Sequence, residues 1–163
     1  MQSIGFVSQR QPDAVEQLKA IWRVCFDAEE EYLHLYFSTR YCPDQTLVWE
    51  EDGQILGMLT LLPCTLRALC QGEWRLYRAS YLFAVGTLPQ ARGRQVATRL
   101  LHAADELLQK QGIQAAILYP AEPSLYHFYG QRGYEKWFFR SLLSFPPLMQ
   151  QGTGWELRPL SAE

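Results

Sequence analysis

The sequence is notable first for what it lacks. It has no run of about eighteen apolar residues, so no segment is expected to span a membrane. Its start, Met1-Gln2-Ser3, does not open a basic-then-apolar signal segment. The cysteines fit no metal-ligand spacing, and they indicate reduced thiols in a cytoplasmic protein without a metal site. They are Cys25, Cys42, Cys64 and Cys70.

Neither sign of charge is in large excess. Fifteen Lys and Arg residues stand against seventeen Asp and Glu residues, which gives a net charge of −2. The isoelectric point of about 5.9 argues against nucleic acid as a partner. With 48% hydrophobic and 20% charged residues, the 163-residue chain is typical of a folded globular domain. Because no repeat, linker or low-complexity segment appears, we expect one domain over residues 1–163.

The most informative stretch joins a strand over 78–88 to an amphipathic helix over 95–111. The join is short and basic, and it contains Gly93 between Arg92 and Arg94. Free N–H groups and the positive end of the helix dipole favour a phosphate at such a point, and the two guanidinium groups can add charge-assisted bonds. Two solvated turn arginines are the simpler interpretation. The coincidence of strand, basic turn and helix favours the anion site.

The rest of the pattern predicts an α/β (α+β) fold with a mixed, mostly antiparallel sheet flanked by helices. Helices are expected over about 13–26, where Asp13 and Glu16 form a reciprocal cap, and over 28–40, where Tyr32, Leu35 and Tyr36 supply the apolar side. Strands are expected over 4–8, 46–49, 55–68 and 73–88, with turns at Asp52-Gly53 and Gln71-Gly72.

Further elements follow the central helix, whose buried stripe is expected from Val96, Leu100, Ala104, Leu107 and Leu108, with Asp105 pointing outward. We expect a strand over 114–119, a helix over 124–132, and strands over 134–145 and 155–160. A strand, a helix and a strand in succession indicate a right-handed crossover that makes 78–88 and 114–119 parallel. Open sheets bind ligands at the carboxyl ends of such strands.

Two motifs resemble the GCN5-related N-acetyltransferase (GNAT) family. Residues 88–101 (LPQARGRQVATRLL) resemble its V-x-P segment followed by R/Q-x-x-G-x-G/A. Residues 128–134 (FYGQRGY) resemble its F/L-Y-x-x-x-G-F/Y stretch, and the gap between the motifs agrees. Within the family, Ile55-Leu56-Gly57 and Tyr119-Pro120-Ala121 resemble a bacterial group akin to the "enhanced intracellular survival" proteins, which are longer.

The resemblance implies a GNAT domain with a splayed parallel strand pair at the cofactor site. It implies acetyl-coenzyme A as co-substrate and transfer of the acetyl group directly to a primary amine of a small molecule or protein. Tyr129 would protonate the departing thiolate. The pantetheine arm would lie along Val85, Gly86 and Thr87. The diphosphate would bind the main chain of Arg92, Gly93, Arg94, Gln95, Val96, Ala97 and Thr98.

Several alternatives stay open at this point. Gln95 stands where the family usually has glycine and could crowd the diphosphate, so a catalytically weak or inactive coenzyme A-binding or sensor module is the second hypothesis. Transfer of a different acyl group is a third. Glu29, Glu30 and Glu122 are candidate bases, and the run 29–31 is either a solvated helix start or an acidic rim for a cationic amine. Aromatic residues 137–139 could fill the core or pair two copies in a homo-oligomer.

Overall fold

A mixed sheet of five strands organises the fold. The structure, a computed structural model, describes residues 2–9 and 13–137. Its strands are β1 (Gln2–Phe6), β2 (Thr46–Glu51), β3 (Gln54–Cys70), β4 (Glu73–Thr87) and β5 (Ala115–Ile117). They lie in the order β1-β2-β3-β4-β5; every neighbouring pair is antiparallel except β4–β5, which is parallel. The predicted fold class and parallel pair are confirmed.

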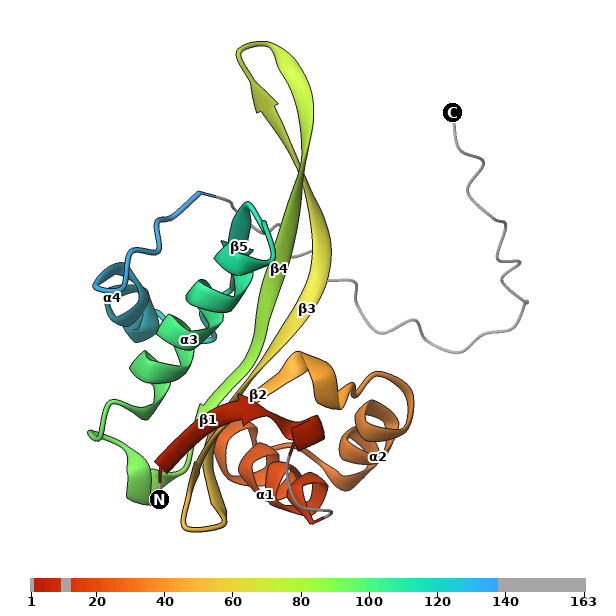
Figure 1. The fold of residues 1–163 in the computed structure, drawn as a ribbon, viewed down its shortest axis with the longest axis vertical. Helices are drawn as coiled ribbons and strands as arrows, with labels where there is room; N and C mark the ends of the chain where they lie inside the picture. The colour runs from red at the N-terminus through yellow and green to blue at the C-terminus, as the bar shows by residue number, and fades with distance from the viewer. Residues whose placement is uncertain (1, 10–12, 138–163) are drawn as a thin grey trace, which may run out of the picture.

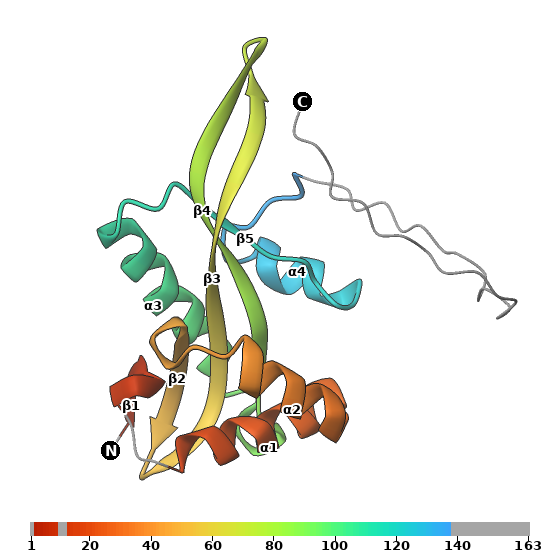
Figure 2. The ribbon, with the colours of Figure 1, turned by 90° about the vertical axis from the view of Figure 1, so that its right-hand side faces the viewer.

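Four helices pack against the sheet in two groups (Figure 1). α1 (Ala14–Phe26) and α2 (Glu30–Thr39) bury Leu18, Ile21 and Leu33 against one face. α3 (Val96–Lys110) buries Leu100 among residues of the other face. α4 (Ser124–Gly130) contributes Tyr129 to the same group of buried side chains as Leu100. In Figure 2 the sheet is seen nearly edge-on, with α3 on one side of it and α1 and α2 below.

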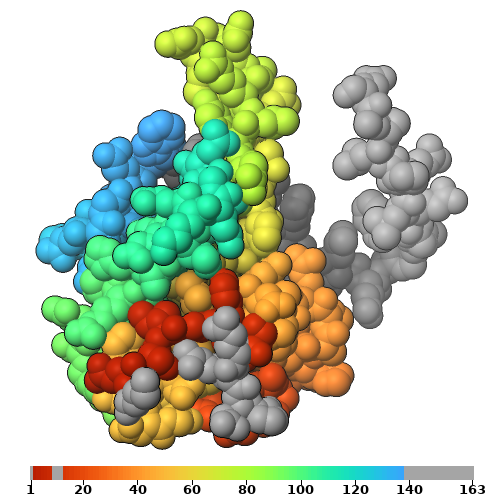
Figure 3. Space-filling model, in the orientation of Figure 1, coloured from red at the N-terminus to blue at the C-terminus, as the bar shows by residue number. Residues whose placement is uncertain are grey.

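Both predicted hairpin turns are present. In each, two consecutive residues adopt positive φ: 50° and 83° at Asp52-Gly53, and 53° and 84° at Gln71-Gly72. This is the pattern of a type I′ turn, which matches the twist of paired strands. The second turn closes the long β3–β4 hairpin, which projects beyond the body of the molecule (Figures 1 and 3). Its exposed apolar side chains are Leu69, Trp74 and Leu76.

A bulge interrupts β4 near its end. Phe83 pairs with Thr60 and Gly86 with Met58, so residues 84 and 85 together oppose residue 59. Ala84 has a φ of 51°, which an L-residue rarely adopts outside a bulge or turn. Pairing of β4 with β5 stops at Tyr81–Ile117. Past that point no described strand covers this side of β4, which gives the splayed pair that the resemblance implied.

Some details of the N-terminal half were predicted wrongly. The first strand covers Gln2–Phe6 rather than 4–8. Asp13 forms no side-chain cap, because its carboxylate accepts a hydrogen bond from the Gln17 amide at 3.1 Å instead. In α2 the buried side chains are Leu33 and Tyr36, and Leu35 is 59% exposed. The apolar side of α2 therefore lies one position away from the expected stripe.

The C-terminal predictions have a mixed outcome. Residues 134–137 are described and form no strand, so the predicted strand over 134–145 does not begin there. The rest of that strand, residues 138 and 139, and the strand over 155–160 lie outside the described residues. Asp105 was expected to point outward, but it is half-buried and accepts a hydrogen bond from the Tyr134 hydroxyl at 3.2 Å. Within the described part of the chain, no helix is long and apolar enough to cross a bilayer.

Candidate active site

Unpaired backbone donors collect where β4 ends and α3 begins. The chain passes through a short 3-10 turn (Pro89–Ala91) and two residues with positive φ, Gly93 (77°) and Gln95 (62°). Among residues 2–9 and 13–137, no backbone carbonyl accepts a hydrogen bond from the N–H groups of residues 93 and 95–98. These five donors lie at the positive end of the dipole of α3, an arrangement suited to an anion.

Gln95 holds a backbone conformation that glycine adopts more easily. Its φ of 62° lies in the left-handed region, and its side chain is exposed and makes no capping bond. The glutamine thus keeps the turn in the shape that a glycine would favour, at an energetic cost of about 1–2 kcal/mol.

The two arginine side chains of the turn are engaged with protein groups, which the sequence did not predict. Arg94 forms an ion pair with Glu51 of β2. A hydrogen bond from the Gln2 amide and this contact with Arg94 both lower the pKa of Glu51. Arg92 donates from Nε to the carbonyl of Thr87 at 3.3 Å. Each guanidinium group uses one nitrogen in these contacts, so the turn can offer an anion both its main-chain N–H groups and the remaining guanidinium donors.

Cys25, at the end of α1, also reaches this region. Its thiol donates to the Thr87 carbonyl at 3.4 Å. Burial raises the pKa of the Cys25 thiol, and the nearby charge of Arg92 opposes that shift. No local pattern predicts this contact, because 62 residues separate Cys25 from Thr87.

The end of β4 turns main-chain groups toward its uncovered side. Leu88 donates its N–H to the carbonyl of Leu56 on β3 at 2.9 Å. Because backbone groups alternate in direction along a strand, the N–H and C=O groups of Thr87 and Val85 face away from β3. An extended ligand could therefore pair with this stretch of β4 as a strand would.

Tyr129 of α4 is the candidate acid, and it is 8% exposed. Burial raises the pKa of its phenol; the charge of Arg132 lowers it and Tyr81 raises it further. The phenol is therefore protonated at neutral pH and can donate a proton. Its ring packs edge-on against Phe128 and Tyr134, with centroids 5.2 Å and 5.8 Å away.

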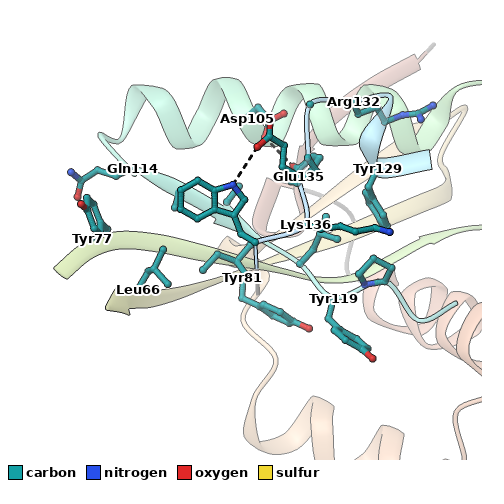
Figure 4. Close-up of a pocket in the computed structure, with 18 of the residues that line it drawn as sticks. Leu66, Tyr77, Tyr81, Asp105, Gln114, Tyr119, Tyr129, Arg132, Glu135 and Lys136 are labelled. Atoms are coloured by element: carbon teal, nitrogen blue, oxygen red, sulfur yellow. Dashed lines mark hydrogen bonds between the residues drawn. The ribbon is translucent and has the colours of Figure 1, made fainter. Parts of the chain in front are cut away.

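Tyr129 lines a cavity of about 1110 Å³ beside β5. In Figure 4 Tyr81 and Tyr119 project to the same side of the sheet, while Asp105 and Arg132 lie on the other side. Aromatic residues thus serve both as core and as cavity wall. The aromatic lining consists of Tyr77, Tyr81, Tyr119, Tyr126, Tyr129, Tyr134 and Trp137.

The predicted bases Glu29, Glu30 and Glu122 do not line the cavity beside Tyr129. Glu30 is held by Arg23 through bonds of 2.6 Å and 3.0 Å, which lower its pKa. Glu122 accepts a bond from the Ser124 hydroxyl at 3.3 Å. Asp105, Arg132 and Tyr134, which sequence reasoning did not assign to the site, do lie beside the cavity. In the part of the chain that the structure describes, no three His, Cys, Asp or Glu side chains are grouped to hold a metal.

Comparisons with known proteins identify the family. A sequence model of the acetyltransferase (GNAT) domain matches residues 7–137. No curated protein sequence matches the chain.

The fold is similar to three solved structures. One is an acetyltransferase from Trypanosoma brucei (TM-score 0.65, 17% identity, 89% of this chain and 100% of that one). Another is glucosamine-6-phosphate N-acetyltransferase from Arabidopsis thaliana (TM-score 0.59, 17% identity, 90% and 99%). A third is Eis1 from Mycobacterium abscessus (TM-score 0.61, 17% identity), of which the aligned part covers 80% of this chain and 31% of that one.

The family match spans most of the chain and includes both motifs, the splayed strand pair and the candidate acid. The chain therefore belongs to the GNAT family of N-acetyltransferases, as its two motifs predicted.

Proposed function

We propose that the protein transfers the acetyl group of acetyl-coenzyme A directly to a primary amine. The observation that carries this proposal is the set of five unpaired N–H groups at residues 93 and 95–98, next to the uncovered side of β4. These donors suit the diphosphate, and the main chain of Val85 together with the N–H of Thr87 suits the amide groups of the pantetheine arm, since the Thr87 carbonyl already accepts from Cys25 and Arg92. The free thiols of the described cysteines fit a reducing compartment, and we propose the cytoplasm.

The proposed reaction needs few groups from the protein. The neutral amine attacks the thioester carbonyl, the C–N bond forms, and the tetrahedral intermediate collapses as the C–S bond breaks. The leaving thiolate takes a proton, and the buried phenol of Tyr129 supplies it. A thiol of pKa about 8.5 is a fair leaving group, so a weak acid suffices. The attacking nitrogen loses its proton to water or to a carboxylate.

The binding step can be tested on its own. We expect calorimetric titration of acetyl-coenzyme A into the protein to give saturable binding. Replacing both Arg92 and Arg94 with alanine should weaken that binding without abolishing it, because the remaining guanidinium donors are lost while the main-chain N–H groups are kept. A wild-type protein that binds no acetyl-coenzyme A would remove the proposal.

The chemical step is tested by Tyr129→Phe. The variant keeps the ring contacts with Phe128 and Tyr134 and loses only the hydroxyl. We expect affinity for acetyl-coenzyme A to be unchanged and amine-dependent thiol release to fall about 10- to 1000-fold near neutral pH. Tyr126→Phe on the same helix is the matched control. Equal turnover by the two variants would leave Tyr129 as a packing residue.

A second function is favoured by one observation. Gln95 carries a side chain at a left-handed position where glycine would be relaxed, so the diphosphate would meet a Cβ atom there that glycine does not have. The same scaffold would then act as a coenzyme A-binding module with little or no turnover. Thiol release measured across a panel of small amines and peptides separates the two functions, because only the enzyme releases coenzyme A in an amine-dependent way. Longer acyl-coenzyme A donors in the same assay test transfer of other acyl groups.

A further inference from the structure

One guanidinium group connects the two halves of the candidate site. Arg132 follows α4, and its Nε and Nη2 atoms donate to the hydroxyl of Thr98 at 3.0 Å and 2.7 Å. Its Nη1 atom donates to the carbonyl of Phe128 at 2.5 Å, and its guanidinium lies 3.6 Å from the centre of the Phe128 ring. The planar, delocalised fork of arginine suits this set of directed bonds, and lysine could not reproduce it.

The two ends of this connection have different roles in the proposed reaction. Thr98 lies in the first turn of α3, and its N–H is one of the five unpaired donors. Phe128 directly precedes Tyr129 on α4. Arg132 also donates its own N–H to the Tyr129 carbonyl at 2.9 Å. The turn that offers anion donors and the helix that carries the acid are thus tied through a single residue.

We propose that Arg132 is a positioning residue that holds the Tyr129 helix against the first turn of α3, so that a cofactor seated on that turn is aligned with the acid. This inference rests on the proposed function of the site. It assigns to Thr98 a role beyond its main-chain donor, because its hydroxyl is the anchor for the guanidinium. The same Tyr129 carbonyl accepts the N–H of Tyr134, whose hydroxyl donates to Asp105 of α3.

Arg132 also acts on Tyr129 through its charge. When the phenol gives up its proton a phenolate forms, and a nearby cation stabilises it. The titratable groups that affect the Tyr129 phenol are Arg132, which lowers its pKa, and Tyr81, which raises it. Tyr134 packs on the ring, and Asp105 lies behind Tyr134. Arg132 thus acts on Tyr129 both by positioning it and by its charge, and variants that remove one effect and keep the other can separate the two.

Thr98→Val removes the anchor while keeping shape, backbone and the charge of Arg132. We expect turnover to fall about 10- to 100-fold, since a small misplacement of a catalytic group has an effect of this size. The calorimetric affinity for acetyl-coenzyme A should stay within about twofold, because the N–H at position 98 is retained. Thr98→Ser keeps the hydroxyl that accepts from Arg132, so it should recover most of the turnover that Thr98→Val loses.

Variants of Arg132 complete the experiment. Arg132→Lys keeps the charge and loses the fork, so turnover should fall as in Thr98→Val while the alkaline limb of the pH–rate profile stays in place. Arg132→Met loses both, and its alkaline limb should move to higher pH because the phenolate loses its cation. The double variant Thr98→Val/Arg132→Met should be no slower than Arg132→Met alone, since both changes break one connection.

The outcomes separate the two proposals. An active wild type whose Thr98→Val variant folds and turns over at the wild-type rate refutes the positioning role alone. If Thr98→Val does not fold, Arg132→Lys decides the same question by the same rate comparison. A wild type that shows no amine-dependent thiol release refutes the proposed function, and the positioning role with it.

Discussion

Replacing Gly57 with alanine should loosen the packing of α3 on the sheet. Gly57 lies in β3, and a Cβ atom there would stand 2.6 Å from Cγ1 of Val96, 3.2 Å from the carbonyl oxygen of Gly86 and 3.3 Å from Cδ1 of Leu100. Val96 is the first residue of α3 and is 2% exposed, so its side chain has no free space to enter. Overpacking of this kind costs about 1–3 kcal/mol of unfolding free energy.

Urea unfolding followed by tryptophan fluorescence measures this loss. The matched control is Gly130→Ala, because a Cβ at Gly130 in α4 meets nothing within 4 Å. Alanine is the better helix former there, so Gly130→Ala should gain about 0.5–1 kcal/mol. Displacing Val96 should also weaken acetyl-coenzyme A binding, because its N–H is one of the unpaired donors. A Gly57→Ala protein as stable as the wild type would refute the reasoning.

Two further predictions concern stability. Gln95→Gly relieves the left-handed backbone, so the unfolding free energy should rise by about 0.5–1 kcal/mol after the entropy of glycine is deducted; a lower urea midpoint would contradict this. Burial raises the pKa of Asp105 above its ordinary 3.8, although the hydrogen bond from Tyr134 opposes the shift. The folded state therefore binds the Asp105 proton more tightly than the unfolded state does. The contribution of this proton to the unfolding free energy falls as the pH rises above the ordinary pKa. As the pH rises from about 4 to about 7, the melting temperature of Asp105→Asn should therefore fall less than that of the wild type. An equal fall of melting temperature in the two proteins would exclude this role.

Local sequence rules predicted the structure correctly where one or two residues determine the backbone conformation. The hairpin turns at Asp52-Gly53 and Gln71-Gly72 were predictable because both need consecutive positive φ angles, which Asp-Gly and Gln-Gly can supply. The parallel pair was predictable because a helix between two strands leaves one favoured connection. The apolar side of α2 was not, since Leu33 and Leu35 are equally apolar and only tertiary packing selects between them.

The chemistry of the site was harder to predict, because its contacts are long-range. Arg94 pairs with Glu51 across 43 residues, and Arg132 bonds to Thr98 across 34. Neither separation leaves a local pattern. The bulge at Ala84 was also invisible, since alanine gives no sign of positive φ. The motifs indicated which stretches matter, but they did not reveal which polar groups the protein itself already satisfies.

Two glycines explain why so many elements meet at the end of β4. Gly57 lets α3 approach one face of the sheet, where a Cβ would collide with Val96. Gly86, in the neighbouring pair of the same ladder, lets α1 approach the other face, where a Cβ would stand 3.1 Å from the Phe26 ring and 3.2 Å from Ile21. The start of α3 and the end of α1 therefore close on the same point from opposite sides. Pairing of β4 with β5 ends at Tyr81, before the bulge at Ala84, so close packing and an open strand edge coincide where the cofactor is proposed to bind.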